Sequence, residues 1–211
     1  MAKPRPAQAK KASDPMTLMN LTAGKWVSQA IAVAAELGIA DLLKDGPRTA
    51  ADVARTANAS EDGVYRLLRA LGSVGLFAET GNRRFRLTPL GRLLRRDSSQ
   101  ALGGYARFTG DQSTWRPWGE LRHSVRTGEP AFDHVFDMPI FEYFAKMPES
   151  AAVFHAAMTS ISTWESKAVV AGYDFSGINT LVDVAGGHGL MIVTILKANR
   201  KIGRASCRER V

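Results

Sequence analysis

The chain has 211 residues, 45% of them hydrophobic, and a formal net charge of +8 at pH 7. This length and composition suffice for a buried core in one or two domains. Residues 1–14 and 201–211 each carry four basic residues against one acidic residue, which leaves a net charge of only +2 for the 186 residues between them. A nearly balanced body of this kind argues against a nucleic-acid partner.

Residues 1–15, MAKPRPAQAKKASDP, contain no apolar segment. A secretory signal needs such a segment after its positive charges, so this stretch is interpreted as a disordered leader, with a transit peptide as the alternative. No unbroken apolar run approaches the ~20 residues of a membrane helix, so no membrane partner is expected. Cys207 is the single cysteine, which rules out a disulfide within the chain and favours a cytoplasmic location.

Residues 16–100 show the element order of a winged-helix domain. Apolar residues at helical spacing predict a helical segment from about Leu18 to Leu43. Thr49 and Ser60 are expected to cap two further helices. The second of these helices carries an apolar stripe formed by Val64, Leu67, Leu68 and Leu71. Two strand-like stretches, GLFAE and RFRLT, then flank a hairpin turn at residues 80–82.

Winged-helix domains either bind DNA or pair with another protein. Candidate phosphate contacts on the second capped helix and the wing are Arg66, Arg69, Arg83, Arg84 and Arg86. The alternative is that these arginines form a solvated face or make ion pairs within a dimer. The weak basic excess of the whole chain favours that alternative.

Residues 101–172 are predicted to form a mainly helical connector that is rich in aromatic side chains. Most of these side chains are expected in the core, and a subset is expected to line an apolar pocket for a flat ligand. Phe154, Met158 and Ser162 recur at every fourth residue, so they share one face of a helix. A buried stripe would show the same spacing, apart from the hydroxyl group.

The segment 173–200 contains a glycine-rich turn. Thr180 to Val184 is a short apolar run that includes Asp183, and it is followed by the glycines Gly186, Gly187 and Gly189 and a helical pattern, LMIVTILKA. This order predicts a buried parallel strand, a tight turn and a helix. Glycines permit positive φ angles and allow a ligand to approach the backbone closely. The start of a helix offers N–H groups that have no partner within the helix. We therefore expect a ligand at the carboxyl end of the strand.

The spacing of the turn narrows the choice of ligand. A dinucleotide fingerprint fails because Ile192 stands at the third glycine position, and no Lys-Ser or Lys-Thr pair follows to complete a phosphate-binding loop. The carboxylate of Asp183 is suited to receive an ammonium group, and the glycine backbone is suited to lie against an amino-acid tail. These requirements match S-adenosylmethionine (SAM).

The segment LVDVAGGHG resembles the SAM-binding motif of the small-molecule O-methyltransferases, a family that acts on phenols, flavonoids and polyketides. The resemblance runs from about residue 18 to 200 and includes VYRLLRALGSVGLF, FRLTPLG and GEPAFDHVFDMPIFEYF. It implies a mainly α fold in the part present: a winged-helix domain, a helical connector, and the first βα unit of an α/β Rossmann-like methyltransferase domain. It also implies SAM as cofactor and a homodimer that forms through the winged-helix domain.

The resemblance assigns roles to particular residues. SAM contacts are implied for Asp183, Gly186, Gly187 and Gly189. The F-x-x-x-M-x-x-x-S helix implies further cofactor contacts from Met158 and Ser162 and substrate contacts from Phe154 and Met158, although its spacing to the turn is shifted by one residue. The family turn usually has the sequence D-x-G-G-G-x-G. Ala185 replaces the first of these glycines, a change that is expected to be tolerated if φ is negative there.

Residues 201–211, KIGRASCRERV, match a translated sequencing adapter codon by codon; the alternative is a divergent basic C terminus. In the family, a second strand that ends in a ribose-binding acid follows at this point. The sequence therefore predicts a fragment whose strand at residues 180–184 has no second strand beside it. We expect the segment from about Asp174 onward to be poorly held, and the chain as written to bind SAM weakly and to methylate nothing.

We interpret the intact parent as an enzyme that transfers a methyl group from SAM to a hydroxyl of a small aromatic or polyketide-like molecule. A winged-helix transcriptional regulator with a ligand-binding C-terminal part and a non-catalytic methyltransferase-like scaffold stay open as alternatives. The catalytic residues are unknown, because the family's catalytic histidine lies beyond residue 200. The histidines at positions 123, 134, 155 and 188 are not assigned to that role. No metal is expected, because no metal-ligand spacing is present.

Overall fold

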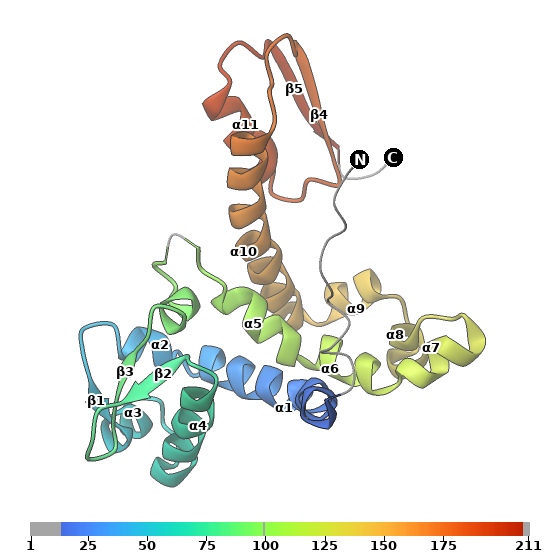
Figure 1. Cartoon of the computed structure of the whole chain (residues 1–211). Coiled ribbons are helices and arrows are strands. Elements are labelled where there is room, and N and C mark those ends of the chain that lie inside the picture. Colours follow the sequence, from blue (N-terminus) through green and yellow to red (C-terminus); the bar gives the residue numbers. More distant parts are fainter. Residues whose placement is uncertain (1–13, 99, 209–211) are drawn as a thin grey trace, which may run out of the picture.

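The structure is a computed structural model that describes residues 14–98 and 100–208. Its elements in chain order are α1 (Pro15–Glu36), α2 (Ile39–Leu42), β1 (Arg48–Thr49), α3 (Ala50–Thr56), α4 (Glu61–Ser73), β2 (Phe77–Glu79), β3 (Arg84–Leu87), the 3₁₀ helix η1 (Gly91–Leu94), α5 (Gly103–Gly110), α6 (Gln112–Gly119), α7 (Leu121–Thr127), α8 (Ala131–Phe136), α9 (Ile140–Lys146), α10 (Pro148–Gly172), β4 (Thr180–Val184), α11 (Leu190–Ala198) and β5 (Arg204–Arg208). In Figure 1, α10 rises from the helical lower part to a separate unit of β4, α11 and β5.

The first helix begins within the expected leader and ends before the expected boundary. Asp14 caps α1, because the backbone N–H of Met16 donates to its Oδ1 at 3.1 Å. Pro15 suits the first helical position, where its missing N–H would have no partner. The helical segment predicted for residues 18–43 is interrupted at Gly38, whose φ of 64° is left-handed, and α2 follows as a separate short helix. Residues 1–13 of the expected leader lie outside the described residues.

The predicted winged-helix order is confirmed. Thr49 and Ser60 cap α3 and α4: the N–H of Asp52 donates to Thr49 Oγ1 at 3.0 Å, and the N–H of Gly63 donates to Ser60 Oγ at 3.4 Å. Strands β2 and β3 form the expected antiparallel hairpin. Strand β1 pairs with the other edge of β3, so the sheet has the order β1-β3-β2.

A single core fills the space between this sheet and helices α1–α4. Its largest fully buried side chains are Phe77, Phe85, Ile39, Leu43, Leu68, Leu71 and Val53. The predicted stripe on α4 is confirmed, since Val64, Leu68 and Leu71 are buried and Leu67 packs against them. Each such side chain contributes about 1.5–3 kcal/mol when it leaves water. The winged-helix part therefore has an apolar core of its own.

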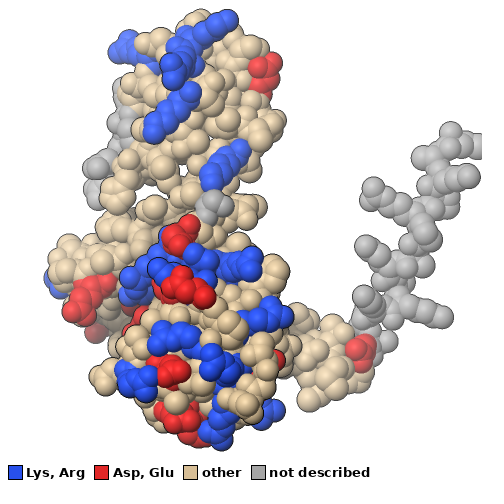
Figure 2. All heavy atoms as spheres, turned by 90° about the vertical axis from the view of Figure 1, so that its left-hand side faces the viewer, with Lys and Arg blue, Asp and Glu red and all other residues tan. Residues whose placement is uncertain are grey.

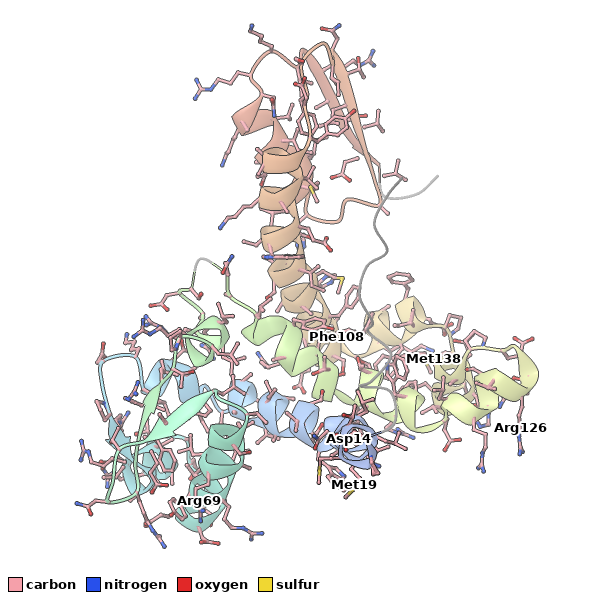
Figure 3. All side chains as sticks on the ribbon, in the orientation of Figure 1. Asp14, Met19, Arg69, Phe108, Arg126 and Met138 are labelled. Atoms are coloured by element: carbon pink, nitrogen blue, oxygen red, sulfur yellow. The ribbon has the colours of Figure 1, made fainter. Side chains whose placement is uncertain are left out.

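The connector is helical, as predicted, and its aromatic side chains form one cluster. Neighbouring rings lie with their centroids 4.5–5.9 Å apart, and the members are Phe108, Phe132, Phe136, Tyr143, Phe144 and Phe154. Phe108 extends this cluster from α10 to α5, near the foot of α10 (Figure 3). The cluster thus packs α8 and α9 against α5 and α10.

The last three elements form a parallel βαβ unit. Strands β4 and β5 pair along their length, with Thr180 opposite Arg204 and Val184 opposite Arg208. The expectation that β4 has no strand beside it is therefore wrong. Parallel pairing uses backbone groups, so it places little demand on the side chains of β5 once a helix returns the chain to the start of the first strand. The buried core of this unit is small and comprises Phe175, Ile195 and Ile202.

Charges of both signs are interspersed over the winged-helix part, as the lower half of Figure 2 shows. Several arginines there have partners within the chain. Arg83 lies 4.4 Å from the ring centroid of Tyr65 and 3.6 Å from the carboxylate of Glu61. Arg84 donates to the carbonyl of Pro47 at 2.8 Å. These contacts favour a solvated, internally paired face over a row of free phosphate contacts.

Candidate cofactor site

The turn between β4 and α11 depends on left-handed backbone conformations. Gly187 and Gly189 have φ angles of 53° and 70°, which residues with a side chain rarely adopt. The N–H of Gly189 donates to the carbonyl of Gly186 at 2.8 Å, and the N–H of Val193 donates to the carbonyl of Gly189 at 3.0 Å. The N–H groups of the first helical turn have no partner within α11, so they are available to a ligand.

Ala185 also adopts a left-handed conformation, with a φ of 58°. On the sequence alone, an alanine is expected to be tolerated here only if φ is negative. The observed φ is positive, so that condition is not met. The left-handed region costs an L-residue about 1–2 kcal/mol, because Cβ approaches the following carbonyl oxygen. The glycine that the family usually has at this position therefore has a physical reason, and the present chain is strained there.

Asp183 places a carboxylate beneath the turn. Its Oδ2 is buried and has no hydrogen-bond partner among the described residues. A Cβ on Gly186 would overlap this carboxylate, whereas a Cβ on Gly187 would meet nothing within 4 Å. Glycine at 186 thus lets the backbone pass over the acid, and the space beside 187 is open. An unpaired buried carboxylate oxygen is costly, and a cationic ligand group would remove that cost.

Helix α10 lies against this turn. The ring of His155 lies 5.4 Å from the ring of His188 in the turn, and α10 packs along α11. Phe154, Met158 and Ser162 are all partly buried on α10. The structure therefore places the helix that carries the F-x-x-x-M-x-x-x-S pattern beside the glycine turn, with His155 of that helix in contact with His188.

Contacts between histidines were not predicted. Besides the pair at the turn, His123 of α7 and His134 of α8 stack with centroids 4.0 Å apart. The partners are 33 and 11 residues apart in the sequence, so no local pattern indicates either pair. Within residues 14–98 and 100–208, no three His, Cys, Asp or Glu side chains lie close enough to hold a metal ion. None of the helices in that described part has the length and apolar content to cross a membrane.

Two family models match the chain. Residues 19–97 match the O-methyltransferase dimerisation domain, and residues 118–203 match the O-methyltransferase domain. The first match takes in the winged-helix part, and the second includes α10 and the glycine turn. The chain belongs to the SAM-dependent O-methyltransferase family.

Relatives and solved structures agree with this assignment. The mitomycin biosynthesis 6-O-methyltransferase of Streptomyces lavendulae is 38% identical over 92% of this chain and 56% of its own length. The crystal structure of LaPhzM has a TM-score of 0.84 and 36% identity over 91% of this chain and 58% of that one. NcsB1 from neocarzinostatin biosynthesis, solved with SAM and 2-hydroxy-5-methyl naphthoic acid, has a TM-score of 0.67 and 32% identity over 86% of this chain and 56% of that one. The chain spans about half the length of the curated relatives it matches.

Proposed function

We propose that this chain is part of an enzyme that transfers a methyl group from SAM to a hydroxyl of a small aromatic or polyketide-like molecule. The buried, unpaired carboxylate oxygen of Asp183 beneath the glycine turn carries the proposal. The relatives support the substrate class, since they include a mitomycin and a phenazine O-methyltransferase. We propose residues 16–100 as the dimerisation domain, 101–172 as the substrate-side connector and 173–200 as the start of the cofactor domain. A cytoplasmic location is proposed from the single cysteine.

The residues of the turn fit the amino-acid end of SAM. Asp183 would receive its ammonium group, directly or through a water molecule. Gly186 and Gly187 would let its carbon chain lie against the backbone, and Gly189 begins the helix whose N–H groups face the ligand. Met158 and Ser162 would approach the cofactor from α10, and Phe154 with Met158 would form an apolar wall for the substrate.

SAM supplies a sulfonium methyl group that a correctly placed oxygen attacks in line. The contribution of this chain is therefore to hold both molecules and to exclude water between them. No residue in the described part is assigned as the general base that would accept the hydroxyl proton. For the 211-residue chain alone we expect neither tight SAM binding nor methyl transfer, because no described residue is assigned to the ribose or the adenine.

The cofactor site is best tested in a chimera that joins residues 1–199 to the remaining C-terminal part of the Streptomyces lavendulae relative. Calorimetric titration should detect SAM binding to this chimera. Gly187→Asn keeps a residue type that tolerates a left-handed φ and places a side chain in the open space. We expect the affinity for SAM to fall at least tenfold, which is about 1.4 kcal/mol.

Gly177→Asn is the matched control. Gly177 also has a positive φ, 83°, and open space around its Cβ position, but it lies in the loop before β4. We expect SAM affinity within twofold of the parent chimera for this variant. Equal affinity of the two variants would show that the turn does not hold the cofactor.

The proposed homodimer rests on the match to a dimerisation domain and on exposed apolar side chains of α1. Leu18, Leu21 and Trp26 are 65%, 73% and 69% exposed, and large apolar side chains exposed together on one helix indicate an interaction surface. Sedimentation velocity should give a dimer at micromolar concentration, and the double variant Leu21→Glu, Trp26→Glu should give a monomer. A monomeric parent chain at high concentration would refute the dimer.

A DNA-binding regulator is the second candidate, because the element order also suits it. It has less support, since Arg83 and Arg84 are engaged within the chain. A gel-shift assay at low salt would separate the two functions. DNA binding that is lost in an Arg66→Ala, Arg69→Ala variant would favour the regulator.

A further inference from the structure

A hollow of about 480 Å³ lies between η1, α5 and α10. This volume is in the range of small-molecule sites. Its α10 wall is formed by Ala156, Thr159, Ser160 and Thr163. These residues lie roughly 150° round the helix from the face of Phe154, Met158 and Ser162, because successive residues turn by about 100°. The hollow is therefore separate from the proposed cofactor and substrate site.

The feature that distinguishes this hollow is Arg107 of α5. Its side chain is partly buried and makes no ion pair or hydrogen bond with any described residue. The other two arginines of the lining are paired: Arg95 donates to Asp97 at 2.8 Å, and Arg96 lies 3.5 Å from Asp41. Arg107 is thus the lining arginine whose charge is left without a partner in the part of the chain that the structure describes.

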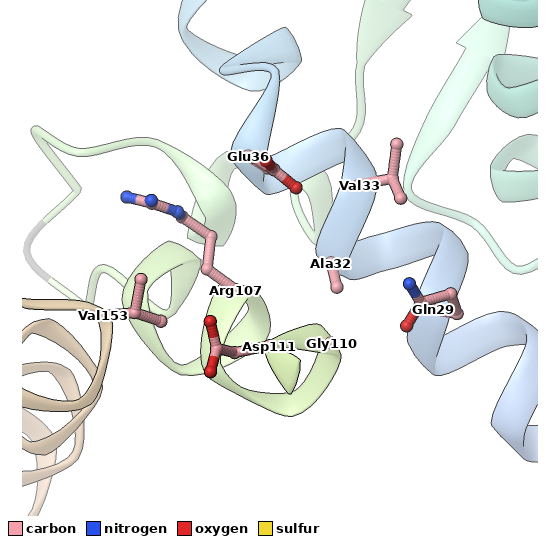
Figure 4. Close-up of a pocket in the computed structure, with 8 residues that line it drawn as sticks. All are labelled: Gln29, Ala32, Val33, Glu36, Arg107, Gly110, Asp111 and Val153. Carbon is pink, nitrogen blue, oxygen red and sulfur yellow. The ribbon is translucent and has the colours of Figure 1, made fainter. Parts of the chain in front are cut away.

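Acidic residues on the other side of Arg107 do not form an ion pair with it, although Glu149 joins Glu36 and Asp111 in lining a neighbouring hollow of about 730 Å³. Glu36 and Asp111 line an adjoining hollow of about 90 Å³ together with Arg107, yet neither lies within ion-pair distance of it. Figure 4 shows the guanidinium extending away from the carboxylate of Asp111 and from Gln29. The Asp111 carboxylate instead accepts hydrogen bonds from Ser113 at the start of α6. A partly buried cation without a partner favours an anionic ligand.

The remaining lining indicates what kind of anion fits. Thr159 has a hydroxyl group without a hydrogen-bond partner among the described residues, so it is free to donate. Around Arg107 and Thr159 the lining includes apolar residues and glycines: Ala35, Leu94, Ala101, Gly103, Gly104 and Ala156. The one carboxylate of the lining, Asp41, is paired with Arg96. A guanidinium group matches a carboxylate with two parallel N–H···O bonds, whereas small apolar walls suit a compact hydrocarbon body.

We propose that this hollow binds a small organic acid, with its carboxylate held by Arg107 and the hydroxyl of Thr159 and its apolar body against Leu94 and Ala156. The site does not require SAM or the glycine turn, so it is independent of the proposed methyl transfer. It gives the family scaffold a second ligand position, on the junction of α5 and α10.

The test uses the full 211-residue chain, with benzoate as the probe and benzamide as its uncharged counterpart. In a titration followed by heteronuclear NMR, benzoate should shift the amide signals of residues 103–107 and 156–163. Benzamide should leave these signals unchanged. Arg107→Met keeps the apolar stem and removes the charge, and we expect at least a tenfold loss of benzoate affinity. Arg107→Lys keeps the charge but cannot donate two parallel hydrogen bonds to the carboxylate. We expect this variant to lose an intermediate amount of benzoate affinity.

Arg126→Met is the matched control, because Arg126 is exposed on α7 and lies far from α5 (Figure 3). This variant should bind benzoate as the parent does. Equal shifts with benzamide, shifts confined to other residues, or tighter binding of inorganic phosphate than of benzoate would overturn the proposal. If Arg107→Met does not fold, the parent shift map and the Arg107→Lys affinity decide the question.

Discussion

The winged-helix part and the β4–α11–β5 unit both follow recognisable sequence patterns, but their packing differs. In the winged-helix part, side chains from helices α1–α4 and strands β2 and β3 pack around one core, and Leu68 and Phe85 are almost completely buried. In the C-terminal unit, Val182 and Val184 of β4 remain 49% and 53% exposed, although β4 is paired with β5. Side-chain caps support α3 and α4, whereas α11 begins at Gly189 with none. A motif thus specifies local backbone geometry without providing the packing that stabilises it.

The largest expected effect is a difference in hydrogen exchange between the two parts. Local stability follows the number of buried apolar contacts, so residues 26–76 should exchange near the rate of global unfolding. Residues 180–198 should exchange at least about 100-fold faster, because a two-stranded sheet with a small core is marginal. Mass spectrometry of peptides from both segments measures this ratio. Equal protection would show that β5 stabilises β4 more than the buried area indicates.

Truncating one apolar side chain in each part should lower the free energy of unfolding more in the winged-helix part than in the C-terminal unit. Leu68 is 0% exposed, and Leu68→Ala should destabilise the winged-helix part by about 2–5 kcal/mol through lost burial and a cavity. Val182→Ala on the half-exposed strand should cost less than about 1 kcal/mol. Urea unfolding followed by circular dichroism compares the two variants. Similar costs would contradict the contrast in packing.

The sequence predicted the features that depend on local residue patterns and missed those that depend on the backbone or on the folded arrangement. Caps at Thr49 and Ser60, the stripe on α4 and the hairpin depend on nearest neighbours and periodicity, and they were predicted. The pairing of β5 was missed because it depends on backbone groups rather than on side-chain pattern. The left-handed φ of Ala185 was missed because the residue type argues against it. The isolation of Arg107 was missed because it depends on where distant acids lie in the fold.

A pair of substitutions in the glycine turn should act in opposite directions. Ala185 and Gly187 have similar left-handed φ values of 58° and 53°. Ala185→Gly should stabilise the C-terminal unit by about 1 kcal/mol because it relieves the contact of Cβ with the carbonyl oxygen, and Gly187→Ala should destabilise it by a similar amount. Exchange rates of the α11 amides report both changes. Two changes of the same sign would mean that the turn conformation is not the source of strain.

The smallest expected effect concerns the cap of α3 and its dependence on pH. A hydrogen bond from the Thr49 hydroxyl, followed by one from Arg55, lowers the pKa of Asp52 below its usual value. Thr49 Oγ1 donates to Asp52 Oδ2 at 2.7 Å. The carboxylate is thus stabilised in the folded state.

Because the folded pKa lies below the unfolded one, this contribution to stability is complete above the unfolded pKa and is lost as the pH falls through the folded pKa. Asp52→Asn should therefore flatten the decline in melting temperature of the winged-helix part below about pH 4. Thr49→Ser keeps both hydrogen bonds and should leave the profile unchanged. The Asp52 side chain is 36% exposed, and solvent there screens its interactions, so the shift should be small. An Asp52→Asn profile that runs parallel to the parent at low pH would show that the Thr49–Asp52 contact does not couple protonation to folding. The caps of this part would then stabilise their helices only by accepting hydrogen bonds from backbone N–H groups.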